Sequence, residues 1–367
     1  MKPDRRDLEL LRLAGRYRWL PLDAFSRFGF ERIGEDIAVL VKLGMLSIAR
    51  NKLYIQLTPK GVRILAEMGF DSDVAAKRPY ENSVTLRRRL EAASVMLTAL
   101  RAGIDTLPDG VDALRSQPVF LPLSAFRSAT TNPASNSTCA GFGHWGGKAF
   151  MLHFVSPASN GMYLATELKT FHNLASVFSQ SIDEPEALVF AGTSYRQVYG
   201  QLTSQAPPKK KGAKGFRDFA HVYGSADVTI HLLSCDETGA MQLALMRQPD
   251  YNARIARAAY GERWEPHDRQ IPDADGAIDG GRTLLIAADM DIHRAERVIE
   301  NARKRGRKGV ALIAFKEQME GLLMGLFPHD GFVLFLKINR EVLDAAFGED
   351  FSLDPFGGGP DRGGRHG

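Results

Sequence analysis

Residues 43–65 read LGMLSIARNKLYIQLTPKGVRIL, and this stretch decides the fold of the N-terminal part of the chain. Residues 45–49 and 53–57 are short and rich in β-forming residues, and a polar Arg-Asn-Lys triplet at 50–52 separates them. This pattern predicts a hairpin with two cations at its tip. A Thr-Pro pair follows, and it provides the cap and the first turn of a predicted helix that ends near residue 69.

Three amphipathic helices are predicted before the hairpin, over residues 4–15, 21–28 and 31–43. The third helix carries its apolar residues on one face, and Gly44 follows it where a helix end favours a left-handed residue. Three helices, a hairpin with a basic tip and a closing helix make the order of a winged helix-turn-helix domain.

The string at 43–65 closely resembles the end of that fold in bacterial DNA-binding domains, and the resemblance extends over residues 5–69. In those domains a Leu-Gly-Leu exit from the recognition helix precedes the wing, and a Tyr-x-Leu-Thr-x-x-Gly segment follows it. The resemblance implies that residues 1–75 form a domain that binds double-stranded DNA.

A helix can enter the major groove only if its outer face is polar, and the helix at 31–43 offers Arg32, Glu35, Asp36 and Lys42. Phosphates repel the two acids, which can read only cytosine amino groups. Docking to another protein is therefore the alternative for this domain. The cations that we expect on the DNA are Arg16, Arg18, Arg27, Arg32, Lys42, Arg50, Lys52 and Lys60.

The composition is that of a globular protein, with 44% hydrophobic and 25% charged residues. No apolar run approaches the ~18 residues of a membrane-spanning helix, and the charged start has no signal-peptide pattern. We therefore expect a cytoplasmic protein without membrane contact. Cys139 and Cys235 predict two reduced thiols. Residues 1–78 hold fifteen Lys/Arg and ten Asp/Glu, a net +5 against +4 for the whole chain, which favours a polyanionic partner.

A linker is predicted at 76–82, and an α/β domain at 83–350, whose first part, 83–235, begins with an arginine-rich amphipathic helix. Strands are predicted over 118–123, 148–155, 162–169, 187–192 and 228–233, with a loop over 124–147 and a helix over 171–182. The fold class is thus α+β. The order of helix, three strands, helix and strand resembles the core of the PD-(D/E)xK nuclease superfamily. The resemblance implies a degenerate restriction-endonuclease-like core, one that lacks part of the acid set of the family.

In that resemblance Glu167 and Lys169 on the third predicted strand match the E-x-K element, and Glu91 on the preceding helix is a further ligand. A carboxylate there would hold Mg²⁺ and the lysine would orient the attacking water. The family also requires an acid on the preceding strand, where this sequence has only His153. The favoured interpretation therefore assigns no catalytic residue, no metal and no cofactor, and the nuclease is the alternative.

A second βαβ unit is predicted over 280–350, and residues 351–367 form a glycine-rich tail that we expect to be disordered. A metal site is one interpretation of Asp289, Asp291 and His293. Acids that follow a strand also cap the next helix, and we favour this capping role. Two further basic clusters, at 209–214 and 303–308, are solvated faces or polyanion contacts.

The whole layout resembles the replication-relaxation proteins of plasmids and integrative elements. The string KLYIQLTPKG at 52–61 carries most of this resemblance, and TLRRRLEAASVMLTAL at 85–100 a looser part. It implies a sequence-specific DNA-binding accessory or regulatory protein in replication, relaxation or mobilisation. A relaxase or a replication initiator is the implied partner, and a homodimer is a further expectation. A nuclease and a protein-docking scaffold are the alternatives.

Overall fold

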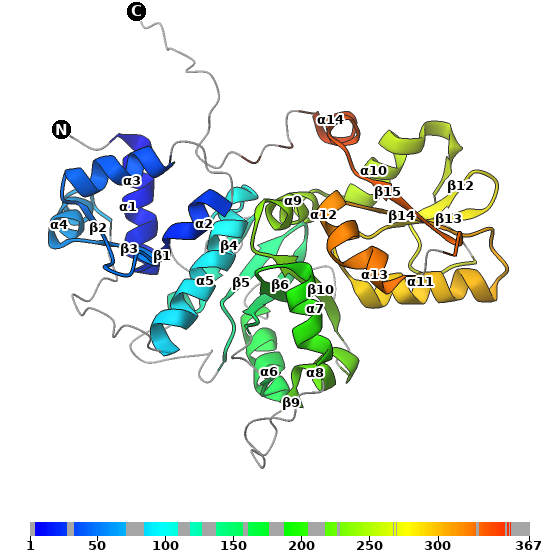
Figure 1. The fold of residues 1–367 in the computed structure, drawn as a ribbon, viewed down its shortest axis with the longest axis horizontal. Helices are drawn as coiled ribbons and strands as arrows, with labels where there is room; N and C mark the ends of the chain where they lie inside the picture. The colour runs from blue at the N-terminus through cyan, green and yellow to red at the C-terminus, as the bar shows by residue number, and fades with distance from the viewer. Residues whose placement is uncertain are drawn as a thin grey trace, which may run out of the picture.

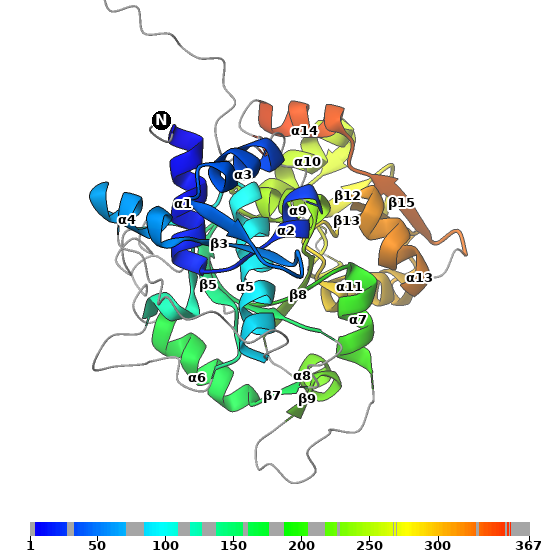
Figure 2. The same cartoon turned by 60° about the vertical axis from the view of Figure 1, so that its left-hand side comes forward.

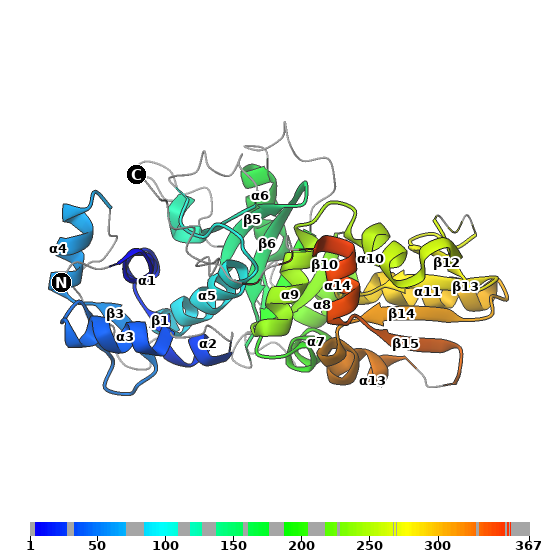
Figure 3. The same ribbon diagram turned by 90° about the horizontal axis from the view of Figure 1, so that it is seen from above.

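The computed structural model describes residues 4–27, 33–70, 84–108, 118–126, 137–156, 161–175, 187–204, 217–225, 228–266, 268, 270–327, 330–348, 351 and 353. Over these ranges the chain is an α+β protein, as predicted, in which an N-terminal unit and two sheets with their helices follow one another in a row (Figures 1 and 3). No helix of the described part is long and apolar enough to cross a membrane. The described residues do not include Arg32, the linker at 76–82 or the basic loop at 209–214.

The N-terminal unit contains the predicted helices and hairpin. Its elements are α1 (Arg5–Tyr17), β1 (Leu20–Pro21), α2 (Leu22–Arg27), α3 (Ile33–Lys42), β2 (Leu46–Ile48), β3 (Tyr54–Leu57) and α4 (Pro59–Glu67). The three strands form one antiparallel sheet in the order β1-β3-β2. Asp4 and Asp7 form a capping box at the start of α1, and the Thr58 side chain caps α4.

The first α/β unit is built around a five-stranded sheet in the order β10-β8-β6-β5-β4. Strands β4, β5 and β6 form an antiparallel meander, and β8 and β10 run parallel to β6. Its elements are α5 (Val84–Arg101), β4 (Val119–Pro122), β5 (Gly141–Trp145), β6 (Lys148–Phe154), β7 (Gly161–Met162), α6 (Leu164–Ala175), β8 (Ala187–Gly192), α7 (Tyr195–Thr203), β9 (Arg217–Asp218), α8 (Phe219–Ser225), β10 (Thr229–Ser234) and α9 (Glu237–Met246).

The predicted strand over 162–169 is wrong, because this segment belongs mainly to the helix α6. The buried residues Glu167, Thr170 and Phe171 recur at helical spacing, and Ala, Glu, Leu and Lys favour a helix. The meander instead gains β5, which lies inside the predicted loop at 124–147. Gly146 and Gly147, both with positive φ, make the tight turn between β5 and β6.

The second α/β unit has the sheet order β11-β12-β13-β14-β15, again with three antiparallel strands followed by two parallel ones. Its elements are α10 (Tyr251–Tyr260), β11 (Trp264–Glu265), β12 (Gly276–Ile278), β13 (Arg282–Ile286), α11 (Ile292–Lys304), β14 (Val310–Ala314), α12 (Lys316–Gln318), α13 (Met324–Leu326), β15 (Val333–Lys337) and α14 (Arg340–Phe347). The parallel crossovers predicted from residue 283 onwards are confirmed. The two sheets therefore share strand order and strand directions, and each is preceded by one helix and followed by another.

The N-terminal unit packs on the first α/β unit through α5 (Figure 2). The Tyr17 hydroxyl at the end of α1 donates to the carbonyl of Thr106, 3.1 Å away and buried. Next to it, Trp19, Tyr54 and Leu86 of α5 form a small buried cluster. The N-terminal unit and α5 thus share apolar surface that neither would bury alone.

We predict that Leu40→Ala in α3 lowers the free energy of unfolding by about 2–5 kcal/mol, because Leu40 is fully buried and its loss leaves a cavity. The neighbouring Val39→Ala is the matched control, since Val39 is 39% exposed, and it should change stability by less than about 0.5 kcal/mol. Urea unfolding of both variants checks this. Equal effects at the two positions would mean that α3 does not pack through the Leu40 face.

Candidate functional sites: a basic N-terminal surface and an acid pair between the sheets

The exposed residues of α3 form one stripe along the helix. They are Gly34, Glu35, Ala38, Val39 and Lys42, at the spacing that puts side chains on one helix face. Asp36 lies beside this stripe and is paired with Arg6 of α1, with 3.5 Å between the guanidinium and the carboxylate. Glu35 and Asp36 are the two acids of α3 that phosphates would repel. Within the described residues, Glu35 alone of these two forms no ion pair.

The tip of the β2–β3 hairpin presents Arg50 and Lys52 to solvent. Neither forms an ion pair with a described residue. The turn is held by its own backbone, since the Lys52 amide donates to Ala49 and the Leu53 amide donates to the Asn51 side chain. Lys52 adopts a positive φ of 56°, which fixes the tight turn and leaves its side chain at the tip.

The other predicted DNA contacts within the described residues differ in their surroundings. Arg16 and Arg27 make bonds within the protein, to the carbonyls of Pro108 and Cys235, and so face the first α/β unit. The exposed Lys60 donates to the carbonyl of Leu43, which closes the end of α3. Arg18 is half-buried and follows α1. Lys42, Arg50 and Lys52 are thus the fully exposed cations of the predicted set without a described partner.

The residues of the nuclease alternative do not form the predicted E-x-K element. Glu167 and Lys169 lie two positions apart on a helix and point in different directions, with Glu167 fully buried and Lys169 exposed. Glu167 accepts from the Ser137 hydroxyl at 2.5 Å and from the Thr138 amide at 2.7 Å, which satisfies its charge.

Two further residues considered for that alternative are also engaged in the core. Burial raises the pKa of Glu91, and the Ser156 side chain donates to it. His153 is buried against Phe190, and burial lowers its pKa, so that it is a neutral core residue. Cys139 and Cys235 are free and buried thiols, as predicted, and burial raises the pKa of each to about 12.

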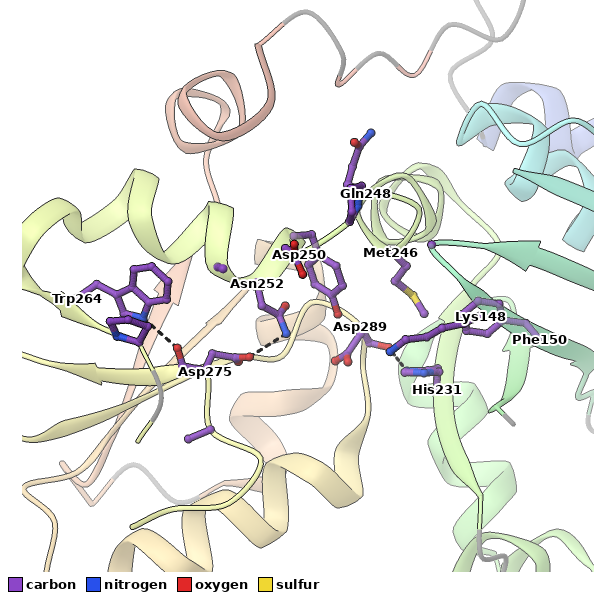
Figure 4. Close-up of a pocket in the computed structure, with 16 residues that line it drawn as sticks. Lys148, Phe150, His231, Met246, Gln248, Asp250, Asn252, Trp264, Asp275 and Asp289 are labelled. Atoms are coloured by element: carbon purple, nitrogen blue, oxygen red, sulfur yellow. Dashed lines mark hydrogen bonds between the residues drawn. The ribbon is translucent and has the colours of Figure 1, made fainter. Parts of the chain in front are cut away.

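A second acidic site, of which the sequence analysis singled out only Asp289, lies where the two sheets meet (Figure 4). Asp275 precedes β12 and Asp289 follows β13, so that adjacent antiparallel strands bring both to one edge. Arg294 of α11 lies between them, 2.6 Å from the Asp275 carboxylate and 3.6 Å from that of Asp289. All three side chains are at most 14% exposed, so one guanidinium is the counter-ion of two buried carboxylates.

Hydrogen bonds from every side fix this acid pair. Asp275 accepts from the Ile286 amide at 2.7 Å and from the Asn252 side chain at 2.8 Å. Burial raises the pKa of Asp275, and Arg294 opposes that rise. The Arg294 guanidinium also donates to the carbonyls of Asp273 and Ile286, which fixes its position between the two acids.

The loop that carries Asp289 is held by the first α/β unit. The carbonyl of Asp289 accepts from Gln242 at 2.9 Å and lies 3.0 Å from His231 Nδ1. The next residue, Met290, has a positive φ of 58°, a strained conformation for a residue with a side chain. Contacts from the other unit therefore impose the position of Asp289.

A cavity of about 450 Å³ opens beside the acid pair. Asp275, Asp289 and Asn252 lie on its wall from the second unit, and Lys148 and His231 on the wall from the first, as Figure 4 shows. The cavity is thus polar and composite. In the first unit, Glu91 and the Ser137–Thr138 segment line a second cavity in the equivalent place, beside the helix before the meander.

Asp289, Asp291 and His293, for which a metal cluster was the alternative to helix capping, do not gather around one point. Asp291 caps α11 by accepting from the Arg294 amide at 2.9 Å, which confirms the capping role. His293 points elsewhere, to the Tyr223 carbonyl and ring. No group of three His, Cys, Asp or Glu side chains gathers for a metal ion anywhere in the described ranges.

Most of the basic cluster at 303–308 is used within the protein. Arg303 pairs with Asp330 at 2.6 Å, Lys304 pairs with Glu300 at 2.7 Å, and Arg307 pairs with Asp268. Arg303, Lys304 and Arg307 are thus engaged in ion pairs within the protein, the first two on the surface and Arg307 with the buried Asp268.

Comparison of the chain with protein-family models, curated proteins and solved structures finds no match.

We predict that Arg294→Met lowers the free energy of unfolding by about 3–5 kcal/mol at pH 7, because it leaves two buried carboxylates without a counter-ion. The variant should regain part of the lost free energy of unfolding when the pH is lowered from 7 to 5. Burial already raises the pKa of Asp275 and Arg294 opposes that rise, so without the arginine the folded protein holds the Asp275 proton at a higher pH than the unfolded chain does, and stability rises as the pH falls.

Arg297→Met on the same helix is the control, since its pair with Asp273 is half-exposed and contributes little. Urea unfolding at several pH values checks both variants. If Arg294→Met costs no more than Arg297→Met at pH 7, the acid pair does not depend on Arg294.

Proposed function

We propose that the chain is a double-stranded DNA-binding protein whose N-terminal unit is a winged helix. One observation carries the proposal: the elements α1-β1-α2-α3-β2-β3-α4, with the sheet order β1-β3-β2, leave one face of α3 and the tip of a basic hairpin exposed together. In winged helices these two parts enter the major groove and contact the flanking phosphates.

The distribution of charge supports the same surface. Lys42 at the end of α3 and Arg50 and Lys52 at the hairpin tip have no described counter-ion, whereas Asp36 is neutralised by Arg6. Unpaired exposed cations release counter-ions from DNA when they contact phosphates, and this is the main source of sequence-independent affinity. In this proposal the two α/β units are attached to the DNA-binding unit and have no hydrolytic role. The strand order of the first of them resembles that of a restriction endonuclease.

The biological setting that we propose follows only from the resemblance to replication-relaxation proteins. It is an accessory or regulatory role in the replication, relaxation or mobilisation of a mobile element, beside a relaxase or a replication initiator. A docking scaffold is the second candidate function, favoured by the apolar share of the α3 stripe, and it predicts no affinity for duplex DNA.

We expect the full-length protein to bind duplex DNA with an affinity that falls steeply with salt. Arg50→Ala with Lys52→Ala should reduce the slope of log K against log salt concentration by roughly 0.9 for each lost phosphate contact. Arg305→Ala with Lys308→Ala removes an equal charge from exposed positions of the second α/β unit and should leave the slope unchanged. Fluorescence anisotropy at several salt concentrations measures both; equal slopes in the two double variants would refute the hairpin contact.

We also expect no cleavage of plasmid or short duplex DNA in Mg²⁺ or Mn²⁺. Phosphodiester hydrolysis requires carboxylates free to converge on a metal ion, and here Glu167 is satisfied by hydroxyl and amide donors while the Arg294 guanidinium lies between Asp275 and Asp289. Incubation of pure protein with and without each metal checks this. Metal-dependent cleavage that Asp289→Asn abolishes would reverse the assignment.

A further inference from the structure

The stripe on α3 has a chemical character that goes beyond affinity for phosphates. Its exposed side chains are a carboxylate at Glu35, methyl groups at Ala38 and Val39, and an ammonium group at Lys42. Val39 is 39% exposed, and it is one of only seven large apolar side chains exposed to this degree in the described residues. Val39 thus places a β-branched apolar side chain in the centre of the outer face of this helix, where a ligand can contact it.

We propose that α3 reads thymine through its C5-methyl group, with Val39 and Ala38 as the contacting residues. The inference rests on the proposed function. Each base pair presents a different pattern in the major groove, and the thymine methyl is its one apolar feature. An apolar side chain in the centre of a major-groove helix matches that group and no other base edge.

Glu35 and Lys42, which flank Val39 on the α3 stripe, would contact other bases or phosphates. Glu35 lies one turn before Val39, and a carboxylate can accept a hydrogen bond from a base only where the amino group of cytosine is offered. Its charge would be repelled by phosphates, which restricts it to the groove floor. Lys42 lies on the last turn, where it can reach a phosphate or the acceptors of guanine.

The other occupant that an exposed apolar stripe suggests is a second protein. Charge favours DNA, because the cations around Val39 are without described counter-ions and lie both on α3 and on the hairpin tip. A protein-docking face of this size is expected to be depleted of charge at its centre, whereas Glu35 and Lys42 flank Val39 directly.

The experiment uses the full-length protein and a duplex selected from a random library. Each thymine of that duplex is then replaced singly by deoxyuridine, which keeps the hydrogen bonds of the base and removes only the C5-methyl group. At one or two positions the affinity should fall roughly fourfold, the effect of exposing one methyl group. At the other positions it should not change, and these positions are the internal control.

Val39→Ala should abolish most of the difference between thymine and deoxyuridine at those positions. Leu334→Ala is the matched control, because Leu334 is a similarly exposed apolar residue (46%) on β15 of the second α/β unit, outside the proposed DNA-binding surface, and it should keep the full difference. Thermal unfolding verifies that both variants are folded. Glu35→Gln should relax the preference for cytosine in a repeated selection.

Three results would overturn the proposal. If the protein binds duplex DNA with a salt-dependent affinity but does not distinguish thymine from deoxyuridine, the reading of thymine is wrong and the proposed function stands. If the protein binds no duplex at all, both are wrong. If Val39→Ala leaves the thymine difference intact and instead changes the oligomeric state, α3 is a protein-docking face.

Discussion

The buried side-chain amides of Gln242 and Gln318 hold the two α/β units together. Gln242 of the first unit donates to the carbonyls of Leu232 in its own sheet and of Asp289 in the second unit. Gln318 of the second unit donates to the Tyr195 hydroxyl of the first unit at 3.3 Å and to the carbonyl of Ala288 in its own unit at 2.9 Å. The Tyr195 hydroxyl donates to Gln242 at 2.8 Å and completes the set. A buried amide without a partner costs about 1–3 kcal/mol, so these groups require one orientation of the sheets, and the composite cavity beside Asp289 depends on it.

The N-terminal unit could be predicted almost element by element because its signals are local. Caps such as Thr58, the polar triplet at the hairpin tip and the spacing of apolar residues in α3 act within a few positions of one another. In the first α/β unit the same reasoning failed at α6, where a short apolar run fits either a strand or a helix. It also missed β5, although the Gly-Gly turn before Lys148 was a usable sign of a hairpin.

The acid pair was missed for a different reason. Asp275 and Asp289 come from neighbouring strands and Arg294 from the next helix, and only the packing of those elements makes them one site. The prediction relied on a known spacing, which singled out Glu167 and Lys169. The spacing within a tripeptide determines only how far apart two residues are in the sequence. Whether their side chains point in the same direction depends on the secondary structure that contains them. The two sheets also show how one strand order accommodates different chemistry, with hydroxyl donors around Glu167 and a guanidinium between Asp275 and Asp289.

The contacts of α1 with the segment after α5, and of β1 and α2 with α5 itself, give the N-terminal unit and the sheets a common orientation, through the Tyr17 hydroxyl and the cluster around Trp19. In the proposed complex with a double helix such a body would have a direction as well as a position. B-DNA completes a turn in about 10–10.5 base pairs, so each base pair of displacement along the groove turns the protein by roughly 35° around the axis. Moving the binding site by about five base pairs would make the second sheet project from the opposite side of the DNA. The spacing between two sites would thus decide whether neighbouring copies face one another or face apart.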